Sequence, residues 1–182
     1  GRIGTANETS IEFFAKTVSL LNNKKQPIEL HIYTKDIKFN ELTSLKVLSG
    51  IKVSPAVPHA SVPNLMSSYD LLLLPLDFNE AGLRFAKLSI PTKASEYMIS
   101  KIPVLVFAPK ETAVTQFFEY NKCGLCVSEK SSQALEKALF SLINDSYLRD
   151  ELTNNAFKIA KDRFDSNKVR DSFREMIRGL VN

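Results

Sequence analysis

The chain has 182 residues, a length that suits one hydrophobic core of ordinary domain size. Hydrophobic residues make up 44% and charged residues 24%, with 6 Gly and 8 Pro, which excludes disordered, collagen-like and low-complexity chains. The net charge of +4 comes from Lys and Arg scattered along the chain, so no nucleic-acid partner is expected. Neither an apolar run long enough for a membrane span nor a basic-then-apolar leader is present. We therefore expect a single domain, residues 1–182, in the cytoplasm, with peripheral attachment to the inner membrane face as an alternative.

Helices alternate with short strands in the first half of the sequence. Apolar residues at helical spacing predict a helix from Ile11 to Leu21, with Thr9 and Ser10 as N-cap candidates. Strands are predicted at 28–33 and 51–57, a weak helix at 41–48 and a short helix at 62–69. The run from Asp70 to Pro75 is apolar on consecutive positions, which is typical of a central parallel strand buried on both faces.

The second half continues the alternation. Residues 76–91 are predicted as a long loop, and 103–107 and 124–127 as strands. Helices are expected at 92–100, 113–120, 133–144 and 148–164, followed by a last amphipathic helix with Val169, Phe173, Ile177 and Leu180 on one face. This pattern predicts an α/β fold: a Rossmann-like, doubly wound parallel sheet with helices on both faces and extra carboxy-terminal helices.

The cysteines form the motif Cys123-Gly-Leu-Cys126, which lies in an expected strand. A redox pair would favour a helix N-terminus, where the helix dipole lowers the thiol pKa. A zinc site would need two more ligands, and the only histidines, His31 and His59, are distant in sequence. We therefore expect structural cysteines, no disulfide framework and no metal. His31, within a strand, is also expected to be structural.

Ligands of doubly wound sheets bind at the carboxyl ends of the strands. No G-x-G-x-x-G, P-loop or G-x-S-x-G motif is present, which disfavours dinucleotide dehydrogenases, P-loop NTPases and serine hydrolases. Two loops after strands remain as candidates, 56–63 and 75–91. In the second, Thr92 and Lys93 stand at a helix start, where free N–H groups and the dipole suit a phosphate. An ordinary loop and surface helix explains this segment equally well.

Three segments together resemble a known family: Asp70-Leu-Leu-Leu-Leu-Pro75, Ile90-Pro-Thr-Lys-Ala-Ser-Glu-Tyr97 and Ile102-Pro-Val-Leu-Val106. They are similar to the donor-binding carboxy-terminal half of GT-B glycosyltransferases of the retaining, group-one type. The resemblance covers nearly the whole chain and is most specific from 58 to 107. It implies transfer of a sugar from a nucleotide-sugar to an acceptor, as in polysaccharide biosynthesis. It also implies an amino-terminal domain of the same full-length protein as partner, without which this domain alone is expected to be inactive.

The resemblance also implies site residues. Glu96 would hold the ribose hydroxyls of the donor nucleotide, a task that suits a carboxylate because it accepts hydrogen bonds from both. The remaining donor-contacting residues are expected to be Ser89, Thr92 and Lys93 at the diphosphate, Val57 and His59 at the base, and Gly4 and Thr5 near the diphosphate or sugar. The donor is a substrate, and no further cofactor and no metal are expected.

The sequence departs from the family pattern at two places. Group-one enzymes usually carry a second glutamate near the donor sugar, but the corresponding position is Leu88, so Glu80 is the candidate for this catalytic place. The cations that usually follow the first strand are also missing, and Arg84 and Lys87 are candidate substitutes, with Lys110 as a weaker one. These departures leave two alternatives open: a degenerate Rossmann-like module that binds a partner protein, and a GT-B nucleotide-sugar epimerase domain.

Overall fold

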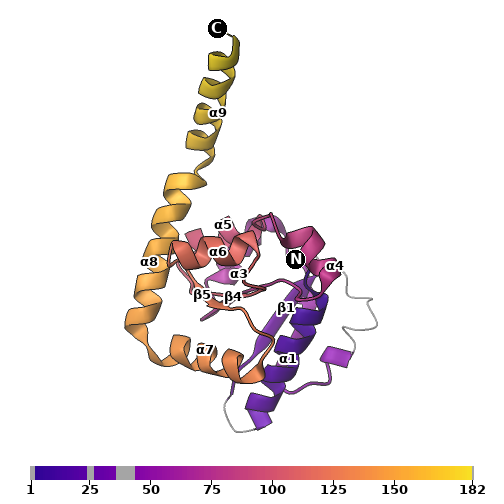
Figure 1. The fold of residues 1–182 in the computed structure, drawn as a ribbon. Helices are drawn as coiled ribbons and strands as arrows, with labels where there is room; N and C mark the ends of the chain where they lie inside the picture. Colours follow the sequence, from indigo (N-terminus) through magenta and orange to yellow (C-terminus); the bar gives the residue numbers. More distant parts are fainter. Residues whose placement is uncertain (1–2, 24–26, 36–43, 182) are drawn as a thin grey trace.

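The computed structural model describes residues 3–23, 27–35 and 44–181. Helices and strands alternate along the chain (Figure 1). The strands are β1 (Leu30–Thr34), β2 (Ile51–Pro55), β3 (Leu72–Pro75), β4 (Val104–Phe107) and β5 (Leu125–Val127). The helices are α1 (Glu8–Asn23), the 3-10 turn η1 (His59–Ser61), α3 (Val62–Met66), α4 (Glu80–Ala86), α5 (Lys93–Ile99), α6 (Ala113–Tyr120), α7 (Ser132–Asn144), α8 (Ser146–Arg163) and α9 (Ser166–Val181).

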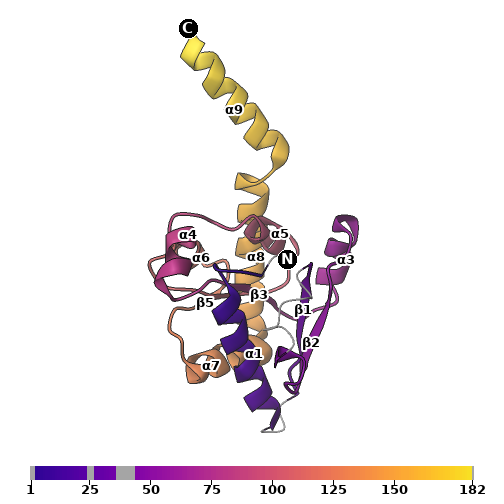
Figure 2. The same ribbon diagram turned by 90° about the vertical axis from the view of Figure 1, so that its right-hand side faces the viewer.

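The strands form two parallel sheets, a two-stranded one of order β1-β2 and a three-stranded one of order β3-β4-β5. Leu30 pairs with Ile51 in the first sheet, and Leu72 pairs with Val104 in the second. Figure 2 shows β1 and β2 to one side of β3 and β5. The predicted α/β class with parallel strands is therefore confirmed. Within the larger sheet the central position belongs to β4, and all four of its residues are buried.

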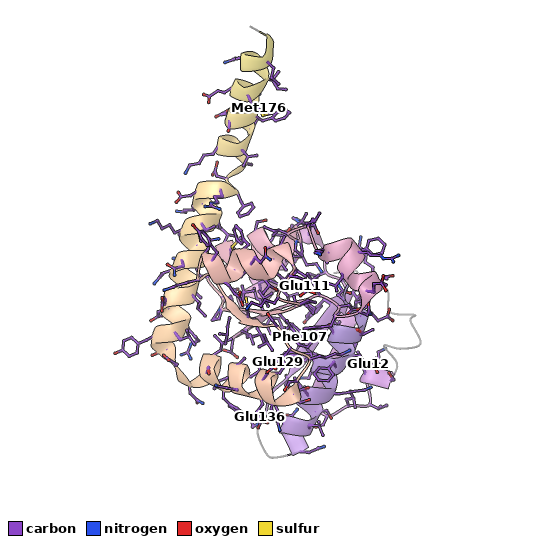
Figure 3. The ribbon with its side chains drawn as sticks, in the orientation of Figure 1. Glu12, Phe107, Glu111, Glu129, Glu136 and Met176 are labelled. Atoms are coloured by element: carbon purple, nitrogen blue, oxygen red, sulfur yellow. The ribbon has the colours of Figure 1, made fainter. Side chains whose placement is uncertain are left out.

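Helices cover both faces of the three-stranded sheet. The side chains of β4 point alternately to these two faces, so β4 contributes to the core on each side. Leu105 and Phe107 face a core that contains α1 and α7, whereas Val104 and Val106 face one that contains α5, α6 and α8. Phe107 lies in the interior of the molecule (Figure 3), and its ring centroid is 4.9 Å from that of Phe78 and 6.0 Å from that of Phe13. Two layers of helices thus hold the ends of the strands in fixed positions.

Two of the predicted elements are wrong in part. Residues 76–91 are not a continuous loop, because α4 forms within them once the Asn79 side chain accepts a hydrogen bond from the Gly82 N–H at 2.7 Å. The first helix begins at Glu8, before the predicted Thr9 and Ser10 caps. The carboxylate of Asp77, distant in sequence, caps it instead by accepting hydrogen bonds from the Thr9 and Ser10 N–H groups. The predicted helix at 41–48 lies partly outside the described residues; residues 44 and 45 are helical.

The last helix, α9, leaves the body of the domain. α8 packs against α5, and α9 continues beyond it, away from the sheets (Figure 1). The predicted apolar face of α9 is present but exposed, as Phe173 and Ile177 illustrate. Met176 on the same helix lies far from the core (Figure 3). Among the described residues, no helix is both long enough and apolar enough to cross a bilayer.

Candidate functional site

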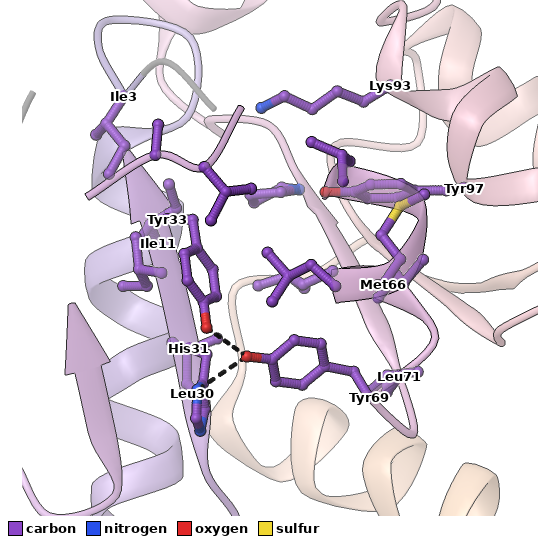
Figure 4. A pocket seen from close by; sticks show the side chains of 18 of the residues that line it. Ile3, Ile11, Leu30, His31, Tyr33, Met66, Tyr69, Leu71, Lys93 and Tyr97 are labelled. Atoms are coloured by element: carbon purple, nitrogen blue, oxygen red, sulfur yellow. Dashed lines mark hydrogen bonds between the residues drawn. The ribbon is translucent and has the colours of Figure 1, made fainter. Parts of the chain in front are cut away.

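A cavity of about 330 Å³ opens between β1 and β3 (Figure 4). Its lower part is lined by side chains of the two strands, and its mouth lies at their carboxyl ends, where Val57, Lys93 and Tyr97 contribute. These are the ends at which an α/β sheet binds ligands. The mouth of the cavity is therefore the candidate site.

Lys93 is the cation of this mouth. Its side chain extends from the start of α5 towards the cavity (Figure 4). Burial lowers the pKa of the Lys93 ammonium, and the charge of Glu96 opposes this shift. The lysine is therefore a partly desolvated cation without a short ion pair to a described acidic residue, a state that an anionic ligand would stabilise.

Tyr97 lies one helical turn further along α5 and also lines the cavity. Burial raises the pKa of its phenol, and the neighbouring Glu96 charge raises it further. The phenol consequently stays protonated near neutral pH and presents a hydrogen-bond donor at the mouth. Tyr97 belongs to the motif 90–97, from which no role was predicted for it.

Glu96 and His59 meet beside the mouth, although they are 37 residues apart in the chain. The distance from His59 Nε2 to Glu96 Oε1 is 3.6 Å, which is longer than a good hydrogen bond. The His59 side chain is 92% exposed and that of Glu96 42% exposed, so both remain accessible to a ligand. The structure therefore brings together the residues predicted for base and ribose.

Helix α5 begins without a side-chain cap. Thr92 occupies the N-cap position with helical backbone angles, and its side chain makes no capping hydrogen bond. Its carbonyl accepts a bond from the Ser95 hydroxyl at 3.0 Å. The Thr92 side chain therefore leaves the first N–H groups of α5 without a side-chain cap, because such a cap typically needs an extended backbone at that residue. Ser89 is exposed in the turn that precedes the helix.

Glu80, Arg84 and Lys87 lie on or at the end of α4 and are exposed. The Glu80 Oε1 atom is 2.7 Å from the Arg84 NH2 group, one helical turn away. None of the three is among the residues that line the cavity. The predicted catalytic and diphosphate residues are thus placed on a neighbouring helix, where the glutamate and the arginine bind each other.

Gly4 and Thr5 belong to a turn that leads into α1. The Gly4 N–H donates to Asn7 Oδ1 at 3.1 Å, and the Gly4 carbonyl accepts from the Asn7 N–H at 2.9 Å. Asn7 lines the cavity. No atom lies within 4 Å of where a Cβ on Gly4 would stand, so the backbone there faces open space.

Asp77 holds this turn in place and was missed by sequence analysis. Its side chain is buried, and its two oxygens accept hydrogen bonds from the backbone N–H groups of Ser10 at 2.7 Å and Thr9 at 3.2 Å. The available signal was a polar residue shortly after the apolar run 71–76, because such positions lie at the carboxyl edge of a sheet.

His31 is part of a bridge between the two sheets. Its Nε2 lies 2.8 Å from Glu29 Oε2, and its Nδ1 lies 3.0 Å from the hydroxyl of Tyr69. The Tyr69 hydroxyl also lies 2.8 Å from that of Tyr33 (Figure 4). Both ring nitrogens of His31 have partners, which agrees with its predicted structural role.

Both cysteines are free thiols. Burial raises the pKa of Cys123 and of Cys126 to about 12, so neither forms a thiolate near neutral pH. This supports their predicted structural role. Within the described part of the chain, no group of three or more His, Cys, Asp or Glu side chains has a geometry suited to a metal ion.

Comparison with known proteins agrees with this geometry. The family model described as glycosyl transferases group 1 matches residues 1–145. The chain belongs to the group 1 glycosyltransferases. The family assignment made from the three sequence segments is thereby confirmed. No curated protein matches the chain.

Solved structures support the fold. The carboxy-terminal domain of the group 1 protein LpcC from Francisella tularensis is 19% identical, with a TM-score of 0.60, and the match covers 91% of this chain and 84% of that one. This confirms the predicted carboxy-terminal half of the GT-B fold.

Two longer structures also match. Anabaena Alr3699/HepE, solved in complex with UDP-glucose, is 17% identical with a TM-score of 0.72, over 98% of this chain and 47% of that one. WaaG, a glycosyltransferase involved in lipopolysaccharide biosynthesis, is 21% identical with a TM-score of 0.58. The match covers 87% of this chain and 40% of WaaG. The chain thus spans less than half the length of these two proteins.

Proposed function

We propose that this chain is the donor-binding half of a hexosyltransferase that takes its sugar from a nucleoside diphosphate sugar. The observation that carries the proposal is the approach of His59 in η1 to Glu96 in α5, within one helical turn of Lys93 at the cavity mouth. A nucleoside diphosphate offers a base, a cis-diol and an anion, and these three side chains match those groups. The UDP-glucose in the Anabaena structure is consistent with such a ligand.

In this proposal each side chain has one task. The Glu96 carboxylate accepts from the ribose hydroxyls, the Lys93 ammonium meets the diphosphate, and Val57 and His59 lie against the base. The Gly4–Thr5 turn and the exposed Ser89 and Thr92 border the diphosphate. With a lysine and backbone N–H groups at the anion, no metal is needed.

We assign Glu80 to the donor sugar. Arg84 and Lys87 are assigned to the diphosphate. The Glu80–Arg84 ion pair opposes the proposed contacts with the sugar and the diphosphate, because each charge neutralises the other. Both residues are exposed, so opening the pair costs little, on the order of 1 kcal/mol or less. A bound diphosphate would draw Arg84 away and free the Glu80 carboxylate.

The whole enzyme is proposed to include a second, acceptor-binding domain. The exposed apolar face of α9 is the surface of this chain that we assign to contacts with that domain. Without it the donor sugar would stay open to water and no acceptor would be placed, so this chain alone is expected to bind donor without transferring it.

A nucleotide titration tests the proposal. UDP, GDP and ADP are titrated into the chain by calorimetry, and melting is followed at saturation. At about 100 times its Kd the preferred nucleotide should stabilise the fold by about 2.7 kcal/mol. The Glu96→Gln variant should weaken its binding by about 10- to 100-fold, the value of one or two charge-assisted hydrogen bonds.

Matched controls separate the site from general charge effects. Glu151→Gln and Lys158→Gln remove equivalent exposed charges from α8 and should leave the Kd within about twofold. If no nucleoside diphosphate binds at millimolar concentration, the donor-binding proposal is wrong. That result would support the alternative of a module that binds a partner protein. Isomerisation of a UDP-sugar by the longer protein without acceptor would instead indicate an epimerase.

A further inference from the structure

Tyr33, Tyr69 and Tyr97 all line the cavity, but their hydroxyl groups differ in their partners. The Tyr33 and Tyr69 hydroxyls lie 2.8 Å apart, and that of Tyr69 also lies 3.0 Å from His31 Nδ1 (Figure 4). The Tyr97 hydroxyl has no hydrogen-bond partner among the residues that the structure describes. Polar groups enclosed by protein are nearly always paired, so this hydroxyl is suited to a bound ligand.

The core holds the ring of Tyr97 in place. The ring packs against the cluster of buried residues that contains Ala94 and Met98 of the same helix and Val104 of β4. Its hydroxyl end extends away from α5 into the cavity, below the end of the Lys93 side chain in the view of Figure 4. Because the ring is already ordered, its hydroxyl can bind a ligand without a large loss of side-chain entropy.

Lys93 and Tyr97 are four residues apart on α5, so their side chains lie on the same face of the helix. Figure 4 shows both side chains extending from this helix into the same part of the cavity. In the described chain neither group is paired with a carboxylate. An ammonium and a phenol side by side offer two hydrogen-bond donors, one of them charged. Such a pair matches a ligand group that is negatively charged and accepts hydrogen bonds, as a phosphate does.

Of the groups of a nucleoside diphosphate, the phosphates suit Tyr97 better than the ribose. Glu96 precedes Tyr97 in the chain, and consecutive residues of a helix point about 100° apart. The Glu96 carboxylate lies beside the mouth, 3.6 Å from His59 Nε2, and as an acceptor it matches the ribose hydroxyls. The phosphate oxygens need donors instead, and Tyr97 supplies one on the helix face of Lys93.

We propose that the Tyr97 hydroxyl donates a hydrogen bond to a phosphate oxygen of the bound nucleotide, beside the Lys93 ammonium. This inference rests on the proposed function, because it takes a nucleoside diphosphate as the ligand of the site. Tyr97 is then a binding residue that selects phosphorylated nucleotides over nucleosides. Its contribution belongs to the hydroxyl alone, since the ring is held by the core with or without a ligand.

The Tyr97→Phe variant tests this proposal, because it removes the hydroxyl and keeps the ring. UDP, GDP and ADP and the nucleosides uridine, guanosine and adenosine are titrated into the parent chain and the variant, and the diphosphate and nucleoside of the preferred base are compared. We expect the Kd of the diphosphate to rise about tenfold, as for the loss of one charge-assisted hydrogen bond. The Kd of the nucleoside should change by less than about twofold. Tyr147→Phe on α8 is the matched control: its side chain is 87% exposed, and neither Kd should change.

Thermal melting without ligand separates binding from a structural role. The hydroxyl has no partner in the described chain, so Tyr97→Phe should melt no lower than the parent. An equal loss of affinity for diphosphate and nucleoside, or a clearly lower melting temperature, would overturn the proposal, because the hydroxyl would then support the fold. An unchanged Kd for the diphosphate would refute this inference alone. If the parent chain binds no nucleoside diphosphate, the proposed function fails together with it.

Discussion

Asp77 shows how a single side chain connects the sheet to the candidate site. It lies two residues after the end of β3, and its carboxylate accepts hydrogen bonds from two N–H groups in the first turn of α1, 67 and 68 residues away. The turn that leads into this helix joins Gly4 to Asn7, and Asn7 lines the cavity. The position of the backbone at the proposed diphosphate site therefore depends on a carboxylate that contacts no ligand.

Replacing Asp77 should measure this connection. Asp77→Asn keeps one acceptor oxygen and should lower the free energy of unfolding by about 1 kcal/mol, whereas Asp77→Ala loses both hydrogen bonds and should lower it by about 2 kcal/mol. Urea unfolding followed by circular dichroism checks both values. Asp150→Ala on α8 is the control, and an Asp77→Ala effect as small as that of the control would contradict the capping role.

Lys93 should make nucleotide binding depend on pH. Burial lowers its pKa in the free chain from the ordinary value of 10.5, and a bound diphosphate would raise it again. The complex then holds more protons than the free chain at pH values between the two pKa values. Affinity is therefore full below the lowered pKa and falls as pH rises through it.

Calorimetric titrations between pH 7 and 10 test this dependence. The Lys93→Gln variant should bind more weakly at pH 7 and lose the alkaline decrease, whereas Lys158→Gln should retain it. An identical pH profile in Lys93→Gln and the parent chain would show that another group titrates with binding.

At the scale of single elements, close packing decides where α6 and β5 lie. Gly124 precedes β5, and a Cβ there would stand 2.6 Å from Phe118 Cδ1 and 2.8 Å from the Val104 carbonyl oxygen. Both neighbours belong to the core, and Phe118 is fully buried. The absence of a side chain thus allows the β5 entry to approach β4 and α6.

Gly124→Ala should consequently destabilise the domain by about 1–3 kcal/mol, because neither the buried ring nor the strand carbonyl has space to withdraw. Gly179→Ala on α9 is the matched control, since no atom lies within 4 Å of its Cβ position. The control should be neutral or slightly stabilising. Denaturant midpoints of the two variants that agree within error would contradict this account of Gly124.

Helix α4 illustrates the limits of local pattern at this scale. Its seven residues lie within the polar and mixed stretch 76–91, and its start depends on the Asn79 cap. Its placement depends on Gly82, whose Cβ position would be 2.5 Å from the Asp77 Cβ. Because the helix is fixed by this contact with the sheet edge, its apolar spacing alone did not predict it.

At the scale of the whole molecule, α9 is a helix that packs little against the rest of the domain. Its residues from Ser166 to Leu180 are exposed, and its apolar face has no cover within the described chain. Deleting residues 166–182 should therefore change the free energy of unfolding by no more than about 0.5 kcal/mol. Chemical denaturation of the shortened chain checks this value, and a loss of several kcal/mol would mean that α9 packs on the body in solution.

The local sequence determined the alternation of helices and strands, the apolar strands at 71–74 and 103–107, and the position of Lys93, Glu96 and Tyr97 along one short helix. These features follow from side-chain periodicity, which neighbouring residues set by themselves. Tertiary structure alone decided that Asp77 caps α1, that His59 meets Glu96 and that two sheet edges enclose a cavity. Each of these depends on the packing of segments that are distant in sequence. The spacing of residues along the chain does not show which distant segments come into contact.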